Sequence, residues 1–155
     1  HFPNKPISAI HVTHAQSSDI SGLAVFAEQG IETLADEYSI AAIKDFPDFS
    51  NDIDKFKFRP IKDEQTINGA RFYVLESMHS KRQSFVYFEE SGIIFQADFL
   101  QIAFDNTIPK IIPNYTRAFI DFLRSKQLSF NRIVSNYQNN NISVEVVNKT
   151  YNAMM

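Results

Sequence analysis

The sequence predicts an α+β fold, in which strand-like and helix-like segments alternate towards both ends and hairpins occupy the middle. The 15 Phe and six Tyr residues, with no Trp, indicate a core filled largely by aromatic rings. A chain of 155 residues is long enough to bury such a core. Because neither an internal repeat nor a linker divides it, we expect residues 1–155 to form a single domain.

The first third alternates between short apolar runs and helical composition. The expected elements are a strand over 7–14, a helix over 21–30, a strand over 31–35, a helix over 36–46 and a polar loop over 47–55. Gly30 is typical of the position that follows a helix, Asp36 can cap the second helix, and Pro47 marks its end.

The rest of the chain predicts hairpins and then a strand between two helices. The expected elements are strands over 55–61, 64–67, 70–77, 84–89 and 92–98, a helix over 114–128, a strand over 131–136 and a terminal helix from 142. The dipeptide Asn68–Gly69 is a strong hairpin signal. The 114–128 segment is predicted from apolar side chains that recur at helical spacing, including Tyr115, Phe119 and Phe122.

Charge and composition exclude several kinds of function. The net charge of −3 and the pI near 5.8 argue against a nucleic-acid surface built on bulk positive charge. No apolar run approaches the ~18 residues of a membrane span, so we expect a soluble protein with no membrane partner. The absence of Cys excludes disulfides, thiolate nucleophiles and Cys-ligated zinc, and it leaves the compartment undetermined.

The segment "THAQSSDISG" at 13–22 carries the first sign of a family. It resembles the metal-binding loop of the metallo-β-lactamase fold superfamily, whose pattern is Thr-His-x-His-x-Asp-His before a small, Gly-rich helix start. Three later segments resemble that family in the same order: "ESMHSKRQSFVYFEESG", "IIFQAD" and "NYTRAFIDFLRSKQLSFNRIVSNY". The resemblance therefore runs over nearly the whole chain.

The resemblance implies an αββα sandwich, and most members of the superfamily are zinc-dependent hydrolases. The chain begins at the strand just before the metal loop, so it is expected to cover the C-terminal two-thirds of the fold without the strands that normally start it. Such a chain would leave one sheet edge and part of the core uncovered. We therefore expect a homodimer whose partner covers that surface.

Seven positions of this sequence correspond to the metal ligands of the family. Three keep the family's residue: His14, His79 and Asp98. Four differ: Gln16 replaces the second His, Ser18 the Asp, Asp19 the His that ends the motif, and Tyr137 the last His. Because zinc binds amides poorly and Ser18 carries no charge, the second metal position is expected to be lost.

Two interpretations of the remaining ligands stay open. In one, His14, His79 and Asp98, helped by Asp19, hold a single zinc ion; in the other they are relics hydrogen-bonded to their neighbours. Asp19 can also cap a helix that begins near Gly22, and this is the role we expect for it. No catalytic residue and no organic cofactor site is identified.

The expected function follows from these substitutions. We expect a degenerate metallo-β-lactamase-like protein, weakly catalytic or inactive, which is used for binding or interaction and takes a small-molecule ligand. The alternative is a metal-dependent hydrolase with a reduced, single-metal site.

Overall fold

A computed structural model describes residues 4–154. The chain divides into two compact units, one ending at Lys62 and the other beginning at Asp63, and each is described by itself. Among the described residues, no helix combines the length and the apolar character needed to cross a membrane.

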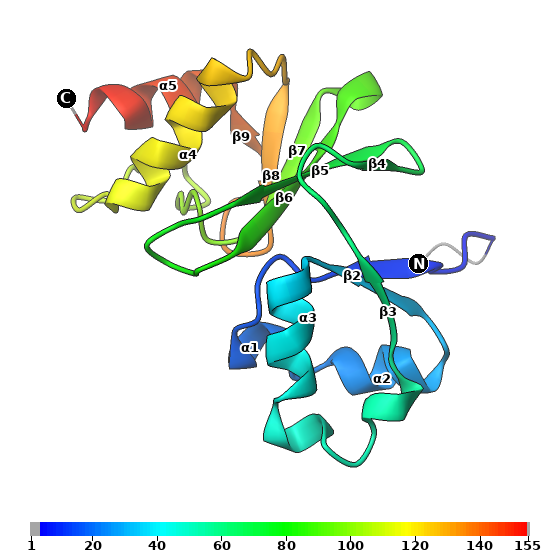
Figure 1. The fold of residues 1–155 in the computed structure, drawn as a ribbon. Coiled ribbons are helices and arrows are strands. Elements are labelled where there is room, and N and C mark those ends of the chain that lie inside the picture. The colour runs from blue at the N-terminus through cyan, green and yellow to red at the C-terminus, as the bar shows by residue number, and fades with distance from the viewer. Residues whose placement is uncertain (1–3, 155) are drawn as a thin grey trace. The chain divides into compact units, whose positions relative to one another are not determined.

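The first unit is a three-stranded parallel sheet in the order β1-β2-β3. Its elements are β1 (Ala9–His11), α1 (Ser17–Ile20), α2 (Leu23–Glu28), β2 (Glu32–Ala35), α3 (Glu37–Lys44) and β3 (Lys57–Pro60). The three helices lie on the same side of the strands (Figure 1). The apolar core forms there, from side chains of all three helices and from the strand ends.

Local sequence explains where these elements begin and end. Gly30 has a φ of 69° just after α2, a backbone conformation that glycine adopts without steric cost. The Asp36 carboxylate accepts hydrogen bonds from the backbone N–H groups of Tyr38 and Ser39, which confirms it as the cap of α3. The segment expected as one helix over 21–30 is preceded by α1, which is too short to show helical periodicity in the sequence.

The polar segment over 47–55 is more ordered than a loop. It forms two 3₁₀ turns, Pro47–Phe49 and Ile53–Lys55, that bring Phe49 into the core. The Phe49 ring lies 5.3 Å from that of Phe46 and 5.1 Å from that of Phe56. Burial of one aromatic ring therefore orders a segment whose other residues are mostly polar.

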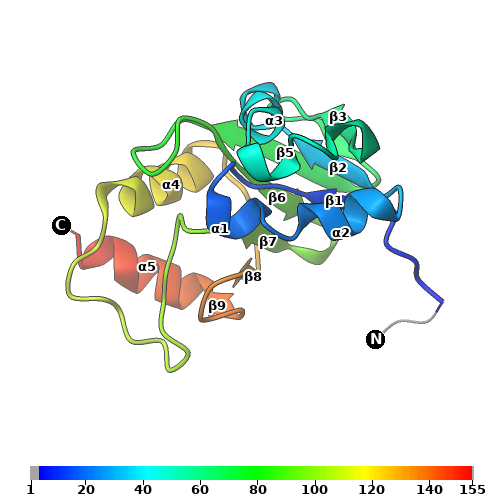
Figure 2. The same cartoon turned by 90° about the horizontal axis from the view of Figure 1, so that it is seen from below.

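The second unit is a six-stranded sheet in the order β4-β5-β6-β7-β8-β9. Its elements are β4 (Thr66–Ile67), β5 (Ala70–Leu75), β6 (Gln83–Phe88), β7 (Ile93–Gln96), α4 (Asn114–Ser125), β8 (Arg132–Ser135), β9 (Ile142–Ser143) and α5 (Val144–Asn152). Strands β4 to β7 pair antiparallel, β8 pairs parallel to β7, and β9 is antiparallel to β8. Helices α4 and α5 lie side by side against this sheet (Figures 1 and 2).

The hairpins and the aromatic core of this unit follow the sequence closely. Ile67 pairs with Ala70, and the two residues between them, Asn68 and Gly69, both have positive φ, as a two-residue hairpin turn requires. Phe85 is fully buried at the centre of the core, where its ring lies 5.0 to 6.3 Å from the rings of Tyr73, Phe99, Phe119 and Phe122. Aromatic side chains from β5, β6 and α4 thus join the sheet to its helices.

Candidate metal-binding residues

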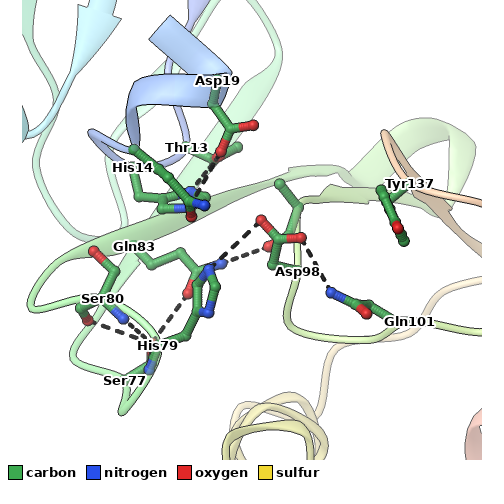
Figure 3. Close-up of polar contacts among 12 residues, drawn as sticks. Thr13, His14, Asp19, Ser77, His79, Ser80, Gln83, Asp98, Gln101 and Tyr137 are labelled. Carbon is green, nitrogen blue, oxygen red and sulfur yellow. Dashed lines mark hydrogen bonds and ion pairs between the residues drawn. The ribbon is translucent and has the colours of Figure 1, made fainter. Parts of the chain in front are cut away.

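In the first unit, the retained histidine is held by its neighbours in the chain (Figure 3). His14 follows β1, and its Nε2 lies 3.1 Å from Oε1 of Gln16 and 3.3 Å from Oδ2 of Asp19. Its Nδ1 lies 3.1 Å from the hydroxyl of Thr13. Two of the residues that replace family ligands therefore contact the one histidine that remains in this segment.

These contacts indicate which nitrogen of the His14 ring carries the proton. A carboxylate only accepts hydrogen bonds, so Nε2 carries the proton when it bonds Asp19, and Nδ1 then accepts from Thr13. A metal on Nε2 requires that proton to leave. His14 is thus arranged either as a hydrogen-bond donor to Asp19 or as a ligand that shares an ion with it.

The expectation that Asp19 caps a helix is wrong. The residue at the start of α2 is Gly22, which receives no side-chain capping bond, whereas Asp19 lies inside α1. Helix α1 begins after Gln16, whose carbonyl accepts from the backbone N–H of Asp19 at 2.9 Å. This extra turn directs the Asp19 carboxylate to His14.

In the second unit, Nε2 of His79 lies 3.7 Å from Oδ2 of Asp98 (Figure 3). This separation is too long for a hydrogen bond. Ligand atoms at ~2.0–2.2 Å from a tetrahedral zinc ion are ~3.3–3.6 Å apart, so both this pair and the His14–Asp19 pair have spacings close to those of metal ligands. Two imidazoles and two carboxylates are also donors that zinc accepts. Each pair fits part of a zinc site.

The loop that follows β5 positions His79. The Ser77 Oγ accepts from the backbone N–H groups of His79 at 3.2 Å and of Ser80 at 3.0 Å. Such a turn fixes the backbone on which the imidazole is carried. On the other side, the His79 ring lies 5.5 Å from that of Tyr115, at the start of α4.

The turn that follows β7 positions Asp98. The backbone N–H of Phe99 donates to the carbonyl of Ala97 at 2.9 Å, and Asp98 between them has a φ of 64°. A non-glycine residue in this three-residue turn is strained, and such strain persists where the surroundings hold it. Buried Gln96 provides that support, since its amide both donates to the carbonyl and accepts from the N–H of Leu100.

The Asp98 carboxylate has a second partner and a charge effect on its surroundings. The amide of Gln101 donates to Oδ1 at 3.2 Å, which leaves Oδ2 directed to His79. Burial, and then the charge of Asp98, raise the pKa of Tyr115. The phenol beside His79 therefore stays protonated across the physiological range.

The other substituted positions do not add ligands. Ser18 is exposed in the first turn of α1, and Tyr137 is exposed after β8, with its backbone N–H bonded to Oγ of Ser135. In the 79–83 segment, Arg82 pairs with Glu76, so it belongs to a surface ion pair.

Sequence reasoning missed the buried amides that hold both loops of the second unit. Gln83 and Gln96 have no exposed surface, although glutamine is usually exposed. A signal was available for Gln83, because it alternates with Phe85 and Tyr87 and so shares their inward face. A polar side chain at an inward strand position indicates a specific hydrogen-bond partner.

Comparison with known proteins establishes the fold. No model of a protein family matches the sequence, and no curated protein matches it. Solved structures do match: the peroxy diiron species of the chemotaxis sensor ODP is 18% identical over 94% of this chain and 68% of that chain, with a TM-score of 0.64. The metallo-β-lactamase of Hirschia baltica is 16% identical over 96% of this chain and 68% of that chain, with a TM-score of 0.65.

A third match is also a metallo-β-lactamase. The metallo-β-lactamase FIM-1 of Pseudomonas aeruginosa, solved in its mono-zinc form, is 16% identical over 96% of this chain and 66% of that chain, with a TM-score of 0.66. The chain therefore has an α+β fold of the metallo-β-lactamase type and spans about two-thirds of the length of these three structures. The expected fold class is confirmed. The matched structures include one named for its diiron species and one named for its single zinc.

Proposed function

We propose that this chain is a metallo-β-lactamase-fold protein with an impaired metal site, which binds a ligand and is weakly catalytic or inactive. The observation that carries the proposal is the environment of His14: its Nε2 is contacted by Gln16 and Asp19, two residues that stand where the family has histidines. An amide is a poor zinc ligand, and a metal must displace the hydrogen bond between imidazole and carboxylate.

The ligand set that we propose is His14, Asp19, His79 and Asp98, serving a single zinc ion. The spacing within each pair and the chemistry of the donors support it, together with the resemblance that assigns both segments to the metal site. A bound zinc ion lowers the pKa of its water towards neutrality, which is the chemistry it would supply here. The residues Gln101 and Ser77 orient Asp98 and the His79 loop respectively.

A second candidate is a hydrolase that works with this single ion. The arrangement of His79 and Asp98 favours it, since their 3.7 Å separation and their braced loops match what a ligand pair needs. This candidate and the first make opposite predictions for turnover at saturating zinc.

A cavity in the second unit offers a place for the ligand. It has a volume of about 240 Å³, and two of its lining residues touch the His79–Asp98 pair: Gln101 through Asp98 and Tyr115 through His79. None of the described residues that line it is charged. We infer that its ligand is small and uncharged, with hydrogen-bonding groups for the Gln101 amide and the Tyr115 phenol.

The test combines metal analysis with turnover. The chain is purified, loaded with zinc and dialysed, and bound zinc is measured by mass spectrometry beside hydrolysis of ester, lactam and phosphodiester substrates. His79→Ala is the variant and Arg82→Ala, a surface residue of the same loop, is the matched control.

Each outcome decides between the candidates. The proposal predicts zinc that is held weakly and lost on dialysis, with little or no turnover when the zinc is restored. One tightly held zinc with turnover that His79→Ala abolishes and Arg82→Ala preserves would establish the hydrolase instead. No zinc binding by either the parent chain or the control at millimolar concentration would reject the ligand set.

A further inference from the structure

Gln83 is a fully buried amide on the inward, aromatic face of β6. It stands first in β6, with no exposed surface, and shares its face with Phe85 and Tyr87 of the aromatic core. An amide at such a position destabilises the fold unless both its ends find partners. Both ends do find them, in two different loops (Figure 3).

The partners fix the orientation of the Gln83 amide. Its Nε2 faces the carbonyl of Ala97, which can only accept, so the NH₂ group must point there. Its Oε1 then accepts from Oγ of Ser77 at 3.0 Å. The Ser77 oxygen also accepts from two backbone N–H groups, and its single hydrogen faces Oε1 of Gln83 at 3.0 Å and the carbonyl of Ser80 at 3.3 Å, of which the Gln83 contact is the shorter.

These hydrogen bonds connect the backbone of His79 to the residue before Asp98, and each donor points in the same direction along the series. The series runs from the backbone N–H of His79 to Ser77, from Ser77 to Gln83, and from Gln83 to the carbonyl of Ala97, the residue before Asp98. The same carbonyl accepts the N–H of Phe99 and so closes the strained turn at Asp98. Hydrogen bonds that follow one another in this way are cooperative.

We propose that Gln83 is a positioning residue that couples the His79 loop to the Asp98 turn and thereby sets the separation of their ligand atoms. The consequence for zinc rests on the proposed function, whereas the coupling itself does not require a metal. Gln83 acts through its hydrogen bonds to Ser77 and to the carbonyl of Ala97.

A double-mutant cycle tests the coupling without metal. In the metal-free chain, amide hydrogen exchange is measured by NMR for Ser77→Ala, Gln83→Met and the double variant. Ser77→Ala is expected to accelerate exchange of the Phe99 amide, in the other loop, about fivefold to tenfold, as expected for loosening by about one hydrogen bond. In the Gln83→Met background, Ser77→Ala should have no further effect on Phe99, because the connection is already broken.

Zinc affinity provides the second readout, with a control for simple destabilisation. Gln83→Met is expected to weaken zinc binding about tenfold to a hundredfold, as for other residues that orient ligands, and Gln83→Glu should not restore it, because a carboxylate cannot donate to Ala97. Thr150→Val is the control. It removes a buried hydroxyl that donates to the Val146 carbonyl in α5, and should lower stability without changing the affinity or the Phe99 amide.

The outcomes separate this proposal from the preceding one. A Phe99 amide that does not respond to Ser77→Ala, or responds equally in the Gln83→Met background, overturns the coupling. A parent chain that binds no zinc rejects the proposed function, and the amide cycle still decides the role of Gln83. Zinc affinity that falls equally in Thr150→Val would assign the effect to general stability and overturn the positioning role.

Discussion

The two units each hold a histidine beside a carboxylate, but they do so by different means. In the first unit, His14 is held by Thr13, Gln16 and Asp19, all within five residues of it along the chain. In the second, the residues that hold His79 and Asp98 come from the β5–β6 loop, from β6 and from the turn after β7. One pair is built locally and the other across the sheet.

This difference determines how each pair responds to substitution. A change at Gln16 alters the surroundings of one imidazole, since its side-chain amide contacts His14. A change at Gln83 reaches both loops of the second unit, because its amide joins them. We therefore expect the His14–Asp19 pair to keep its arrangement after side-chain substitutions of a kind that would disorder the His79–Asp98 pair.

Substitutions in the apolar cores of the two units should have the largest effect, which is on the free energy of unfolding. Phe85→Ala should lower the free energy of unfolding by ~3–5 kcal/mol, because it empties the centre of the aromatic cluster in the second unit. Phe49→Ala should have an effect towards the lower end of that range, since Phe49 has two ring neighbours among the described residues, compared with four for Phe85. Urea unfolding monitored by amide exchange in each unit measures both, and equal losses in both units for either variant would contradict separate cores.

Removing each histidine compares the pairs directly. His79→Ala should weaken zinc binding by at least ~100-fold, whereas His14→Ala should weaken it less, because Gln16 and Asp19 already compete for the His14 ring. Competition titration with a chromogenic chelator measures both affinities. Phe88→Ala, an exposed residue at the end of β6, serves as the control. A larger loss at His14 would reverse our ranking of the two pairs.

The sequence predicted those features that depend on local chemistry. The hairpin at Asn68, the cap at Asp36 and the helix α4 each follow from residue types whose backbone preference or spacing is visible in the chain. The candidate ligands were found from a resemblance, and the structure places them as two pairs, His14 with Asp19 and His79 with Asp98.

The features that the sequence did not predict depend on distant partners or on short segments. The bonds of Gln83 link residues 77 and 97, and nothing in the sequence marks those as neighbours. The four residues of α1 are too few for periodicity, which is why Asp19 was expected as a cap. The single domain and the homodimer stay predictions, and sedimentation velocity at micromolar concentration tests the latter.

Backbone conformation distinguishes the two carboxylates and predicts effects of opposite sign. Asp98 has a positive φ, so Asp98→Gly should be more stable than Asp98→Ala by ~1 kcal/mol. Asp19 lies in a helix, so Asp19→Ala should be more stable than Asp19→Gly by ~0.5–1 kcal/mol. Urea unfolding of the four metal-free variants measures both differences, and the same sign at both positions would show that the Asp98 turn relaxes when its carboxylate is removed.

The smallest effect that we predict concerns His11, which lies in β1 of the first unit. Burial lowers the pKa of His11 from 6.5 to about 4; the residue keeps part of its surface in solvent, but its Nδ1 is buried. Between these two values the unfolded chain binds the proton and the folded chain does not, so the free energy of unfolding should fall as the pH drops from 6.5 towards 4. Below about pH 4 both states are protonated, and this contribution stays constant.

His11→Gln should remove that part of the pH dependence. Because solvent screens the partly exposed ring, we expect the difference between the two chains to change by less than ~1 kcal/mol between pH 7.5 and pH 5. Urea unfolding at pH 7.5, 6 and 5 measures it, and subtracting the two curves cancels the groups that titrate in both chains. If the free energy of unfolding depends on pH in the same way for both chains, His11 titrates alike in the folded and unfolded chains. Water would then reach the His11 ring in the folded first unit.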